Sequence, residues 1–321
     1  MTPFDAINAG FARIFRPGRL SLGLVVPIDH YGIASLPELN RITARVQQAE
    51  ALGFGAVWLR DIPFNVPSFG DTGQIYDPFV FATWLAAKTE HIALASGSII
   101  LPLRHPAHVA KSAASIDQLS GGRWIMGVAS GDRPEEYPAT AKDYEHRGAA
   151  FRDHFDYIRA MADDYPRLSN SAGQLRGDID CLPKPVGQRI PMAVTGASQQ
   201  PMDWVAKHAD AWITYPRPPA LQAQIIQDWQ SRVRELRDTP VPVSQSLYID
   251  LVRDAPAQPI PIHLGWRLGI QQLHDLLATL QASDVNHVAL NLRFNTAPIE
   301  DTLTELAAHL FPIFGCQEES P

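Results

Sequence analysis

The chain has 321 residues, 45% of them hydrophobic, and its mean hydropathy of -0.11 is that of an ordinary globular protein with a sizeable core. Its formal net charge of -7 leaves no basic surface for a phosphodiester backbone, so we expect no nucleic-acid partner. No apolar run approaches the ~18 residues of a membrane span, and the N-terminus lacks a signal peptide, so we expect a cytoplasmic protein with no membrane partner.

Strand-like and helix-like patterns alternate along most of the chain. At its start, Phe4, Ile7, Phe11 and Ile14 recur at helical spacing, which predicts a short helix that covers the floor of the fold or forms a subunit contact. Eight apolar runs typical of buried strands follow: 22–28, 56–59, 92–103, 124–129, 190–195, 211–214, 243–252 and 287–292. A stretch with helical apolar spacing comes after each of them: 36–52, 79–88, 109–119, 151–161, 199–208, 219–237, 268–280 and 303–310.

This alternation predicts the fold class. Two buried strands joined by a helix form a parallel βαβ unit. Eight such units in a chain of this length predict an α/β protein with one domain over residues 1–321, a single (β/α)8 TIM barrel. A doubly wound open sheet is the alternative, and it is disfavoured because no Gly-x-Gly-x-x-Gly follows the first strand. In both folds ligands bind at the C-terminal ends of the strands.

Three irregular segments interrupt the alternation. Residues 166–189 contain scattered Ser, Gly and Pro, and we interpret them as an insertion before strand five that packs outside the barrel, because the alternation resumes at once. Residues 63–77 form a long loop after strand two, and residues 254–263 a proline-rich loop after strand seven. Both loops are expected at the C-terminal end of the barrel, where they are placed to close a site.

The strongest local signal of a bound anion lies at the end of strand five. There a buried strand runs into Gly196, Ala197 and Ser198, and a helix is predicted immediately afterwards. Backbone N–H groups at a helix N-terminus, together with a serine hydroxyl, form a ready phosphate site. An ordinary N-cap serine would satisfy the same donors without a ligand. The spacing alone does not decide between these two interpretations.

Several motifs together resemble one known family. They are GFGAVWLRD at 53–61, LRHP at 103–106, LSGGRW at 119–124, Gly127, GD at 131–132, Arg147 and Phe151, VTGAS at 194–198 and HLGWRLG at 263–269. In combination they resemble the bacterial-luciferase-like flavin oxidoreductases, and the resemblance extends from strand one to strand eight. It implies a (β/α)8 barrel that holds FMN, or a deazaflavin in a sister branch, at the C-terminal ends of the strands.

The resemblance also assigns expected cofactor-binding residues. Ser198 and the amides of Gly196 and Ala197 match the positions at which the family holds the flavin phosphate. The residues that match the isoalloxazine-lining positions are Asp61, Ser98 and Ser130. A peptide bond of the family that is often cis without proline would lie around Gly97–Ser98.

Arg147 leads the fourth predicted helix and is a further cofactor-binding residue by resemblance. The chain departs from the sulfonate-monooxygenase branch at the next position, where Gly148 replaces a tyrosine. This difference removes one flavin contact and leaves the substrate class open.

Few side chains are needed for the chemistry, because a flavin supplies the redox reactivity itself. His30 follows strand one and is a candidate catalytic contact to substrate or flavin. Asp61 is a candidate proton handler, although it could equally anchor a loop. Trp266 and Arg267 are candidates for a mobile lid over the substrate, with a core tryptophan and a surface arginine as the alternative.

Three further side chains need no catalytic role. His105 stands in a turn that the family shares, which favours a structural role. Cys181 and Cys316, the only cysteines, have no metal-ligand spacing, so no metal site is predicted.

The favoured function is that of an FMN-dependent oxidoreductase, a monooxygenase that uses reduced flavin and O2 on a small organic substrate. The alternatives are a deazaflavin-dependent hydride-transfer enzyme and a flavin-binding barrel without turnover. Because the chain shows no dinucleotide fingerprint, we expect a separate NAD(P)H-dependent flavin reductase as partner. The expected assembly is a homo-oligomer, a dimer.

Overall fold

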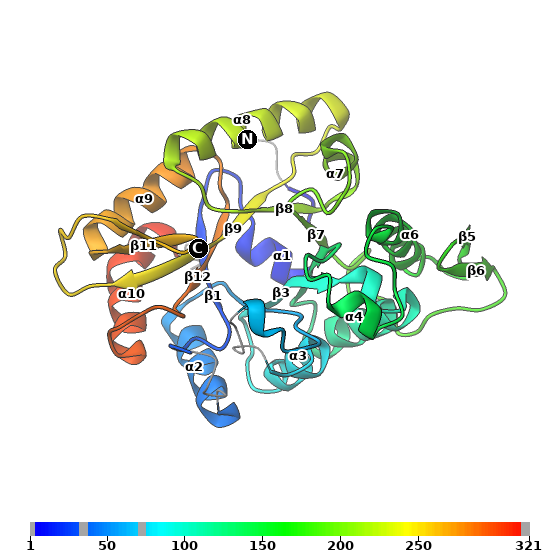
Figure 1. The fold of residues 1–321 in the computed structure, drawn as a ribbon, viewed down its shortest axis with the longest axis horizontal. Helices are drawn as coiled ribbons and strands as arrows, with labels where there is room; N and C mark the ends of the chain where they lie inside the picture. The colour runs from blue at the N-terminus through cyan, green and yellow to red at the C-terminus, as the bar shows by residue number, and fades with distance from the viewer. Residues whose placement is uncertain (1–3, 32–37, 70–74, 316–321) are drawn as a thin grey trace, which may run out of the picture.

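Eight parallel strands form a closed barrel in the computed structural model, which describes residues 4–31, 38–69 and 75–315 (Figure 1). The barrel strands are β1 Ser21–Val25, β2 Ala56–Leu59, β3 Ala93–Ile100, β4 Trp124–Ala129, β7 Met192–Thr195, β8 Ala211–Thr214, β9 Val243–Leu251 and β12 His287–Asn291. The last strand, β12, pairs with both β9 and β1, and β8 pairs with β9. The predicted barrel is therefore confirmed, and the open sheet is excluded because the sheet closes on itself.

Helices surround the barrel (Figure 1). They are α1 Ala9–Ile14, α2 Leu39–Leu52, α3 Pro78–Ala86, α4 Pro106–Leu119, α5 Glu136–Ala139, α6 Arg147–Ala160, α7 Met202–His208, α8 Pro219–Leu236, α9 Ile270–Ala282 and α10 Ile299–Phe314. The eight predicted helices correspond to α2, α3, α4, α6, α7, α8, α9 and α10. The first two residues of the predicted 36–52 helix lie outside the described residues.

Several predicted elements extend beyond their observed ends, and two of them do so for clear local reasons. The strand predicted over 92–103 ends at Ile100 and continues as a 3₁₀ helix, Leu101–Leu103. Pro102 has no N–H to donate to a neighbouring strand, which accounts for this end. The helix predicted from residue 199 begins at Met202, because Ser198 and Gln199 have left-handed backbones, with φ of 46° and 61°.

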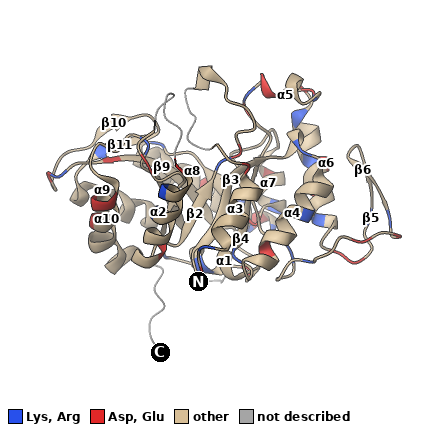
Figure 2. Cartoon of the chain, turned by 90° about the horizontal axis from the view of Figure 1, so that it is seen from below, with Lys and Arg blue, Asp and Glu red and all other residues tan. Residues whose placement is uncertain are grey.

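The core has an inner and an outer layer. Small residues that point into the barrel, such as Ala56, Ala95 and Ala193, share one buried cluster with Phe11 and Ile14 of α1. Alternate residues of the same strands pack outward against the helices in a second, larger cluster. Helix α1 therefore fills the floor of the barrel, and the opposite end is left for the loops. Figure 2 shows α1 at one end of the barrel, with α5 at the other.

Two hairpins extend the barrel. The insertion over 166–189 contains an antiparallel hairpin, β5 Arg167–Asn170 and β6 Gly173–Arg176, that lies beside α6 on the outside of the barrel (Figure 1). Asn170 Nδ2 donates to the carbonyl oxygen of Asp153 in α6 at 2.8 Å. Cys181 of the insertion is buried, and Cys316 lies outside the described residues.

The second hairpin, β10 Ile260–Ile262 and β11 Gly265–Leu268, follows β9. Its strand β11 pairs in parallel with residues 248–251 of β9, so the proline-rich loop is partly ordered as sheet. Its tip is formed by His263 and Leu264. Among the described residues, no helix is both long and apolar enough to cross a membrane.

Candidate functional site

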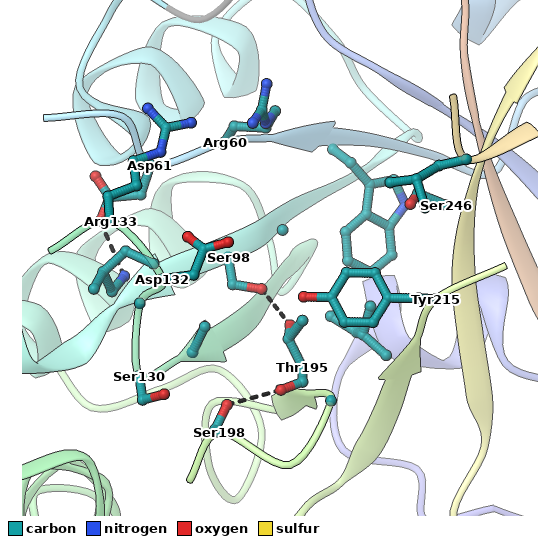
Figure 3. Close-up of a pocket in the computed structure, with 18 of the residues that line it drawn as sticks. Arg60, Asp61, Ser98, Ser130, Asp132, Arg133, Thr195, Ser198, Tyr215 and Ser246 are labelled. Carbon is teal, nitrogen blue, oxygen red and sulfur yellow. Dashed lines mark hydrogen bonds between the residues drawn. The ribbon is translucent and has the colours of Figure 1, made fainter. Parts of the chain in front are cut away.

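A cavity of about 770 Å³ lies at the C-terminal ends of the barrel strands (Figure 3). Every barrel strand, or the loop directly after it, contributes residues to its lining. This volume is within the usual range of small-molecule and cofactor sites. The cavity is therefore the candidate active site.

Seven of the predicted cofactor-binding residues line this one cavity. They are Asp61, Ser98, Ser130, Arg147, Gly196, Ala197 and Ser198. They come from five separate stretches of the chain, which the barrel brings together. Whether they bind a cofactor stays a prediction. The peptide bond between Gly97 and Ser98 is cis, as the resemblance predicts.

The other candidates lie elsewhere. His30 is exposed and does not line the cavity, because the loop after β1 is tied to helix α2: Arg45 Nη1 lies 2.5 Å from Asp29 Oδ2 and donates to the carbonyl oxygen of Ile28. His30 therefore does not join the strand-end residues that line the cavity.

Trp266 and Arg267 also lie outside the cavity lining. Trp266 packs against the outer core layer, and Arg267 Nη1 lies 3.5 Å from Asp250 Oδ2 on β9. The hairpin instead contributes its tip residues, His263 and Leu264, to the cavity. The hairpin thus reaches the site through different residues from the two that were predicted.

Asp61 forms a bidentate ion pair. Arg104 donates from Nη2 to Asp61 Oδ1 at 2.7 Å and from Nε to Oδ2 at 3.0 Å, and the N–H of Ile100 donates to Oδ2 at 3.1 Å. The same Arg104 donates to Asp77, the N-cap residue of α3. Because both oxygens of Asp61 are occupied, this geometry favours the loop-anchoring interpretation over proton transfer.

His105 has a structural role, since its Nδ1 accepts from the N–H of Ala107 and caps α4.

The turn after β7 presents backbone donors to the cavity. In the described part of the chain, the N–H groups of Ala197, Ser198 and Gln199 donate to no protein acceptor. Left-handed backbones at Gly196, Ser198 and Gln199 curl this segment into a concave loop of the kind that binds anions. The hydroxyl of Ser198 donates to the carbonyl oxygen of Thr195 at 2.8 Å, so it stabilises the turn (Figure 3).

Helix α6 begins directly against this turn. Gln200 Nε2 donates to the carbonyl oxygen of Gly148 at 2.7 Å. A Cβ atom at Gly148 would lie 2.8 Å from Cβ of Gln199, too close for a side chain. The close approach explains why glycine follows Arg147 in this chain. Arg147 itself packs its guanidinium 3.7 Å from the ring centroid of Tyr144 at the cavity wall.

One wall of the cavity is held by a buried histidine that the sequence did not indicate. Trp58 lines the cavity, and its Nε1 donates to Nε2 of His287 at 2.9 Å. Nδ1 of His287 must then carry the proton and donate to Ser21 Oγ at 2.7 Å, and Ser21 donates to the carbonyl oxygen of Ile14. Burial lowers the pKa of His287 to about 3, so the ring is neutral.

A second unpredicted residue is Glu136, the first residue of α5. Its side chain lines the cavity, yet the residue is only 2% exposed, and Oε1 has no hydrogen-bond partner in the described chain. Burial, opposed by the charge of Arg133, raises the pKa of Glu136 to about 7. In the sequence, Glu136 could have been noticed only because it follows the end of a strand, four residues after Asp132. Many surface carboxylates share that pattern, so it does not indicate a site residue.

Comparison with known proteins adds to this geometry. A family model described as luciferase-like monooxygenase matches residues 17–256. The pyrimidine monooxygenase RutA of Allorhizobium ampelinum is 29% identical over 203 residues, which are 59% of this chain and 54% of that protein. The chain thus spans about half the length of that relative.

Two solved structures of similar fold carry different cofactors. An F420-dependent secondary alcohol dehydrogenase in complex with an F420–acetone adduct has a TM-score of 0.75 at 14% identity, over 92% of this chain and 99% of that one. The oxygenating constituent of 3,6-diketocamphane monooxygenase from Pseudomonas putida, in complex with FMN, has a TM-score of 0.68 at 13% identity, over 92% of this chain and 98% of that one. At these identities the likeness shows the fold alone.

Proposed function

The chain belongs to the luciferase-like monooxygenase family, and we propose that it binds FMN in the cavity and uses reduced FMN and O2 to oxygenate a small organic substrate. The observation that carries this proposal is the turn after β7, with three backbone N–H groups that have no protein acceptor in the described chain. A phosphate group accepts hydrogen bonds only, and such a turn supplies donors alone. The cavity wall next to it contributes the positive charge of Arg147.

The residues present fit an FMN molecule. Ala197, Ser198 and Gln199 would hold the phosphate through their N–H groups. Ser98 and Ser130 line the same cavity and would border the isoalloxazine ring, as the resemblance implies. Trp58, which His287 holds in place, would form an apolar wall. The flavin supplies the redox chemistry when bound, and these residues orient it.

The loops at the rim would exclude water from the bound cofactor. His263 and Leu264 of the β10–β11 hairpin and Ser68 and Phe69 of the loop after β2 line the cavity. Residues 70–74 of that loop lie outside the described residues. Closing such a cavity strengthens the hydrogen bonds inside it and protects reactive intermediates from water.

A separate NAD(P)H-dependent reductase would supply the reducing equivalents, and a homodimer is the proposed assembly. The name of the Pseudomonas putida relative supports such a division of labour, since it describes an oxygenating constituent. A deazaflavin remains the competing cofactor, as the F420-dependent structure illustrates.

The test has two parts. The absorbance spectrum and mass of the cofactor that copurifies with the native protein should identify FMN, and FMN titration should quench flavin fluorescence. Anaerobically reduced FMN is then mixed with the protein, candidate substrates and ¹⁸O2, and product mass should increase by one ¹⁸O atom. A copurified deazaflavin, or oxidation of substrate without O2, would overturn the monooxygenase proposal in favour of hydride transfer.

A further inference from the structure

Glu136 is a buried acid that the proposed flavin chemistry does not use. A carboxyl group that is 2% exposed usually has partners for both oxygens, because an unsatisfied buried polar atom costs ~1–3 kcal/mol. Here Oε1 has none in the described chain, although the side chain lines the cavity. A bound molecule is the partner that would satisfy this oxygen.

The surroundings of Glu136 include few positive charges. The backbone N–H of Phe64, in the loop after β2, hydrogen-bonds to its carboxyl group. Asp61 faces it from the end of β2, and Asp132 and Arg133 face it from the loop after β4. Arg133 packs over the ring of Phe69, 4.4 Å from the centroid.

These surroundings favour the neutral acid. Burial raises the pKa of Glu136 most, Asp61 and Asp132 raise it further, and Arg133 and the Phe64 N–H lower it, which together bring it to about 7. The group can therefore be a hydrogen-bond donor at neutral pH, which an ionised carboxylate cannot be.

We propose that Glu136 is a substrate-binding residue whose neutral carboxyl group donates a hydrogen bond to the carbonyl oxygen of an uncharged organic substrate. This inference deepens the proposed function by naming the substrate class. The substrate is assigned to this end of the cavity because Glu136 lies with Asp61 and Arg133, whereas the phosphate donors lie at Ser198. Figure 3 shows Asp61 and Arg133 in its upper left part and Ser198 at the bottom.

The test measures binding without turnover, so its outcome does not depend on whether the protein oxygenates anything. Cyclohexanone is titrated into the protein as purified, by isothermal calorimetry at pH 6 and pH 8. Methylenecyclohexane, which has the same shape but no oxygen, is the control ligand. Since the pKa is about 7, the protonated fraction falls about tenfold between these pH values. Cyclohexanone should bind about tenfold more weakly at pH 8, because only that fraction is competent to bind, while the control ligand should show no change.

Two variants separate binding from folding. Glu136→Gln keeps a donor of the same shape without titration, so cyclohexanone should bind it equally at both pH values. Glu136→Leu should bind the ketone weakly at both. An infrared carbonyl band of a protonated carboxylic acid should titrate near pH 7 in the wild type and disappear in Glu136→Gln.

Four results would overturn the inference. One is the absence of cyclohexanone binding to the wild type at either pH. Another is a wild-type affinity that does not change with pH, or a Glu136→Gln variant that keeps the wild-type pH dependence. The last is a loss of FMN affinity in Glu136→Gln with unchanged ketone binding, which would assign the acid to the cofactor.

Discussion

The buried pair of Trp58 and His287 makes stability depend on pH in a calculable way. In the folded protein Nε2 of His287 accepts from Trp58, so a proton there would put two donors face to face at 2.9 Å. The pKa of His287 is lowered by burial to about 3, against an ordinary value of 6.5. Between these values the unfolded chain binds a proton that the folded chain does not, so stability rises with pH.

The magnitude follows from the two pKa values. Each unit below 6.5 costs about 1.4 kcal/mol until the folded pKa is reached. At pH 4.5 this histidine alone should therefore reduce the free energy of unfolding by about 2.7 kcal/mol relative to neutral pH.

The assay is urea unfolding at pH 7, 6, 5 and 4.5 for the wild type and for His287→Gln. Glutamine can accept from Trp58 through its amide oxygen but cannot titrate, and its smaller side chain should cost about 1–3 kcal/mol at every pH. All other ionisable groups are common to both proteins and cancel in the difference. Wild-type stability should therefore fall more steeply with acid than that of the variant. If the free energies of unfolding of the wild type and the variant fell in parallel from pH 7 to 4.5, the assignment of a neutral His287 would be refuted.

Three further outcomes are expected. Ser198→Ala should weaken FMN binding by about 1 kcal/mol, whereas Gly196→Val should weaken it more, because valine disfavours the left-handed φ of 56°. Fluorescence titration compares the FMN affinities of the two variants. A larger effect in Ser198→Ala would contradict the role of the backbone turn. Arg104→Gln should lower the free energy of unfolding by about 3 kcal/mol, because it leaves the buried carboxylate of Asp61 without its cation; urea unfolding measures this, and a neutral effect would count against the anchor. Shortening the loop over 254–263 should leave FMN affinity unchanged but raise the hydrogen peroxide released per reduced FMN oxidised, and an unchanged peroxide yield would show that the hairpin does not protect the site.

Periodicity predicted the barrel because every strand and helix carries its own local signal. Strands β2, β4 and β8 begin and end at the predicted residues, since turn residues or charges flank them directly. Errors arose where backbone geometry overrides apolar spacing, as at Pro102 and at the left-handed Gln199. Such positions depend on the fold around them, which apolar spacing does not report.

The candidate site was predictable only in part. The turn that is proposed to bind phosphate overlaps a contiguous motif, VTGAS, which a resemblance can match. Trp58 and His287 are separated by 229 positions, and only barrel closure brings them into contact. His30 was predicted from its place after a strand, but in the structure it is exposed and lies outside the cavity lining, next to the ion pair of Asp29 with Arg45. The course of a loop and the contacts between residues far apart in the chain are therefore the features that apolar spacing does not predict.

Strand β9 has a further consequence for how this protein can diversify. On one side its first half, residues 243–245, pairs with β8, and its far half, residues 248–251, pairs with the appended β11. The hydrogen bonds that close the barrel and those that carry the hairpin are therefore separate along one strand. Evolution or a protein engineer can exchange the hairpin as a module, with new tip residues in place of His263 and Leu264, while every closing bond is kept. The closure of the barrel therefore depends on the first half of β9, and the cavity lining at the hairpin tip depends on its far half.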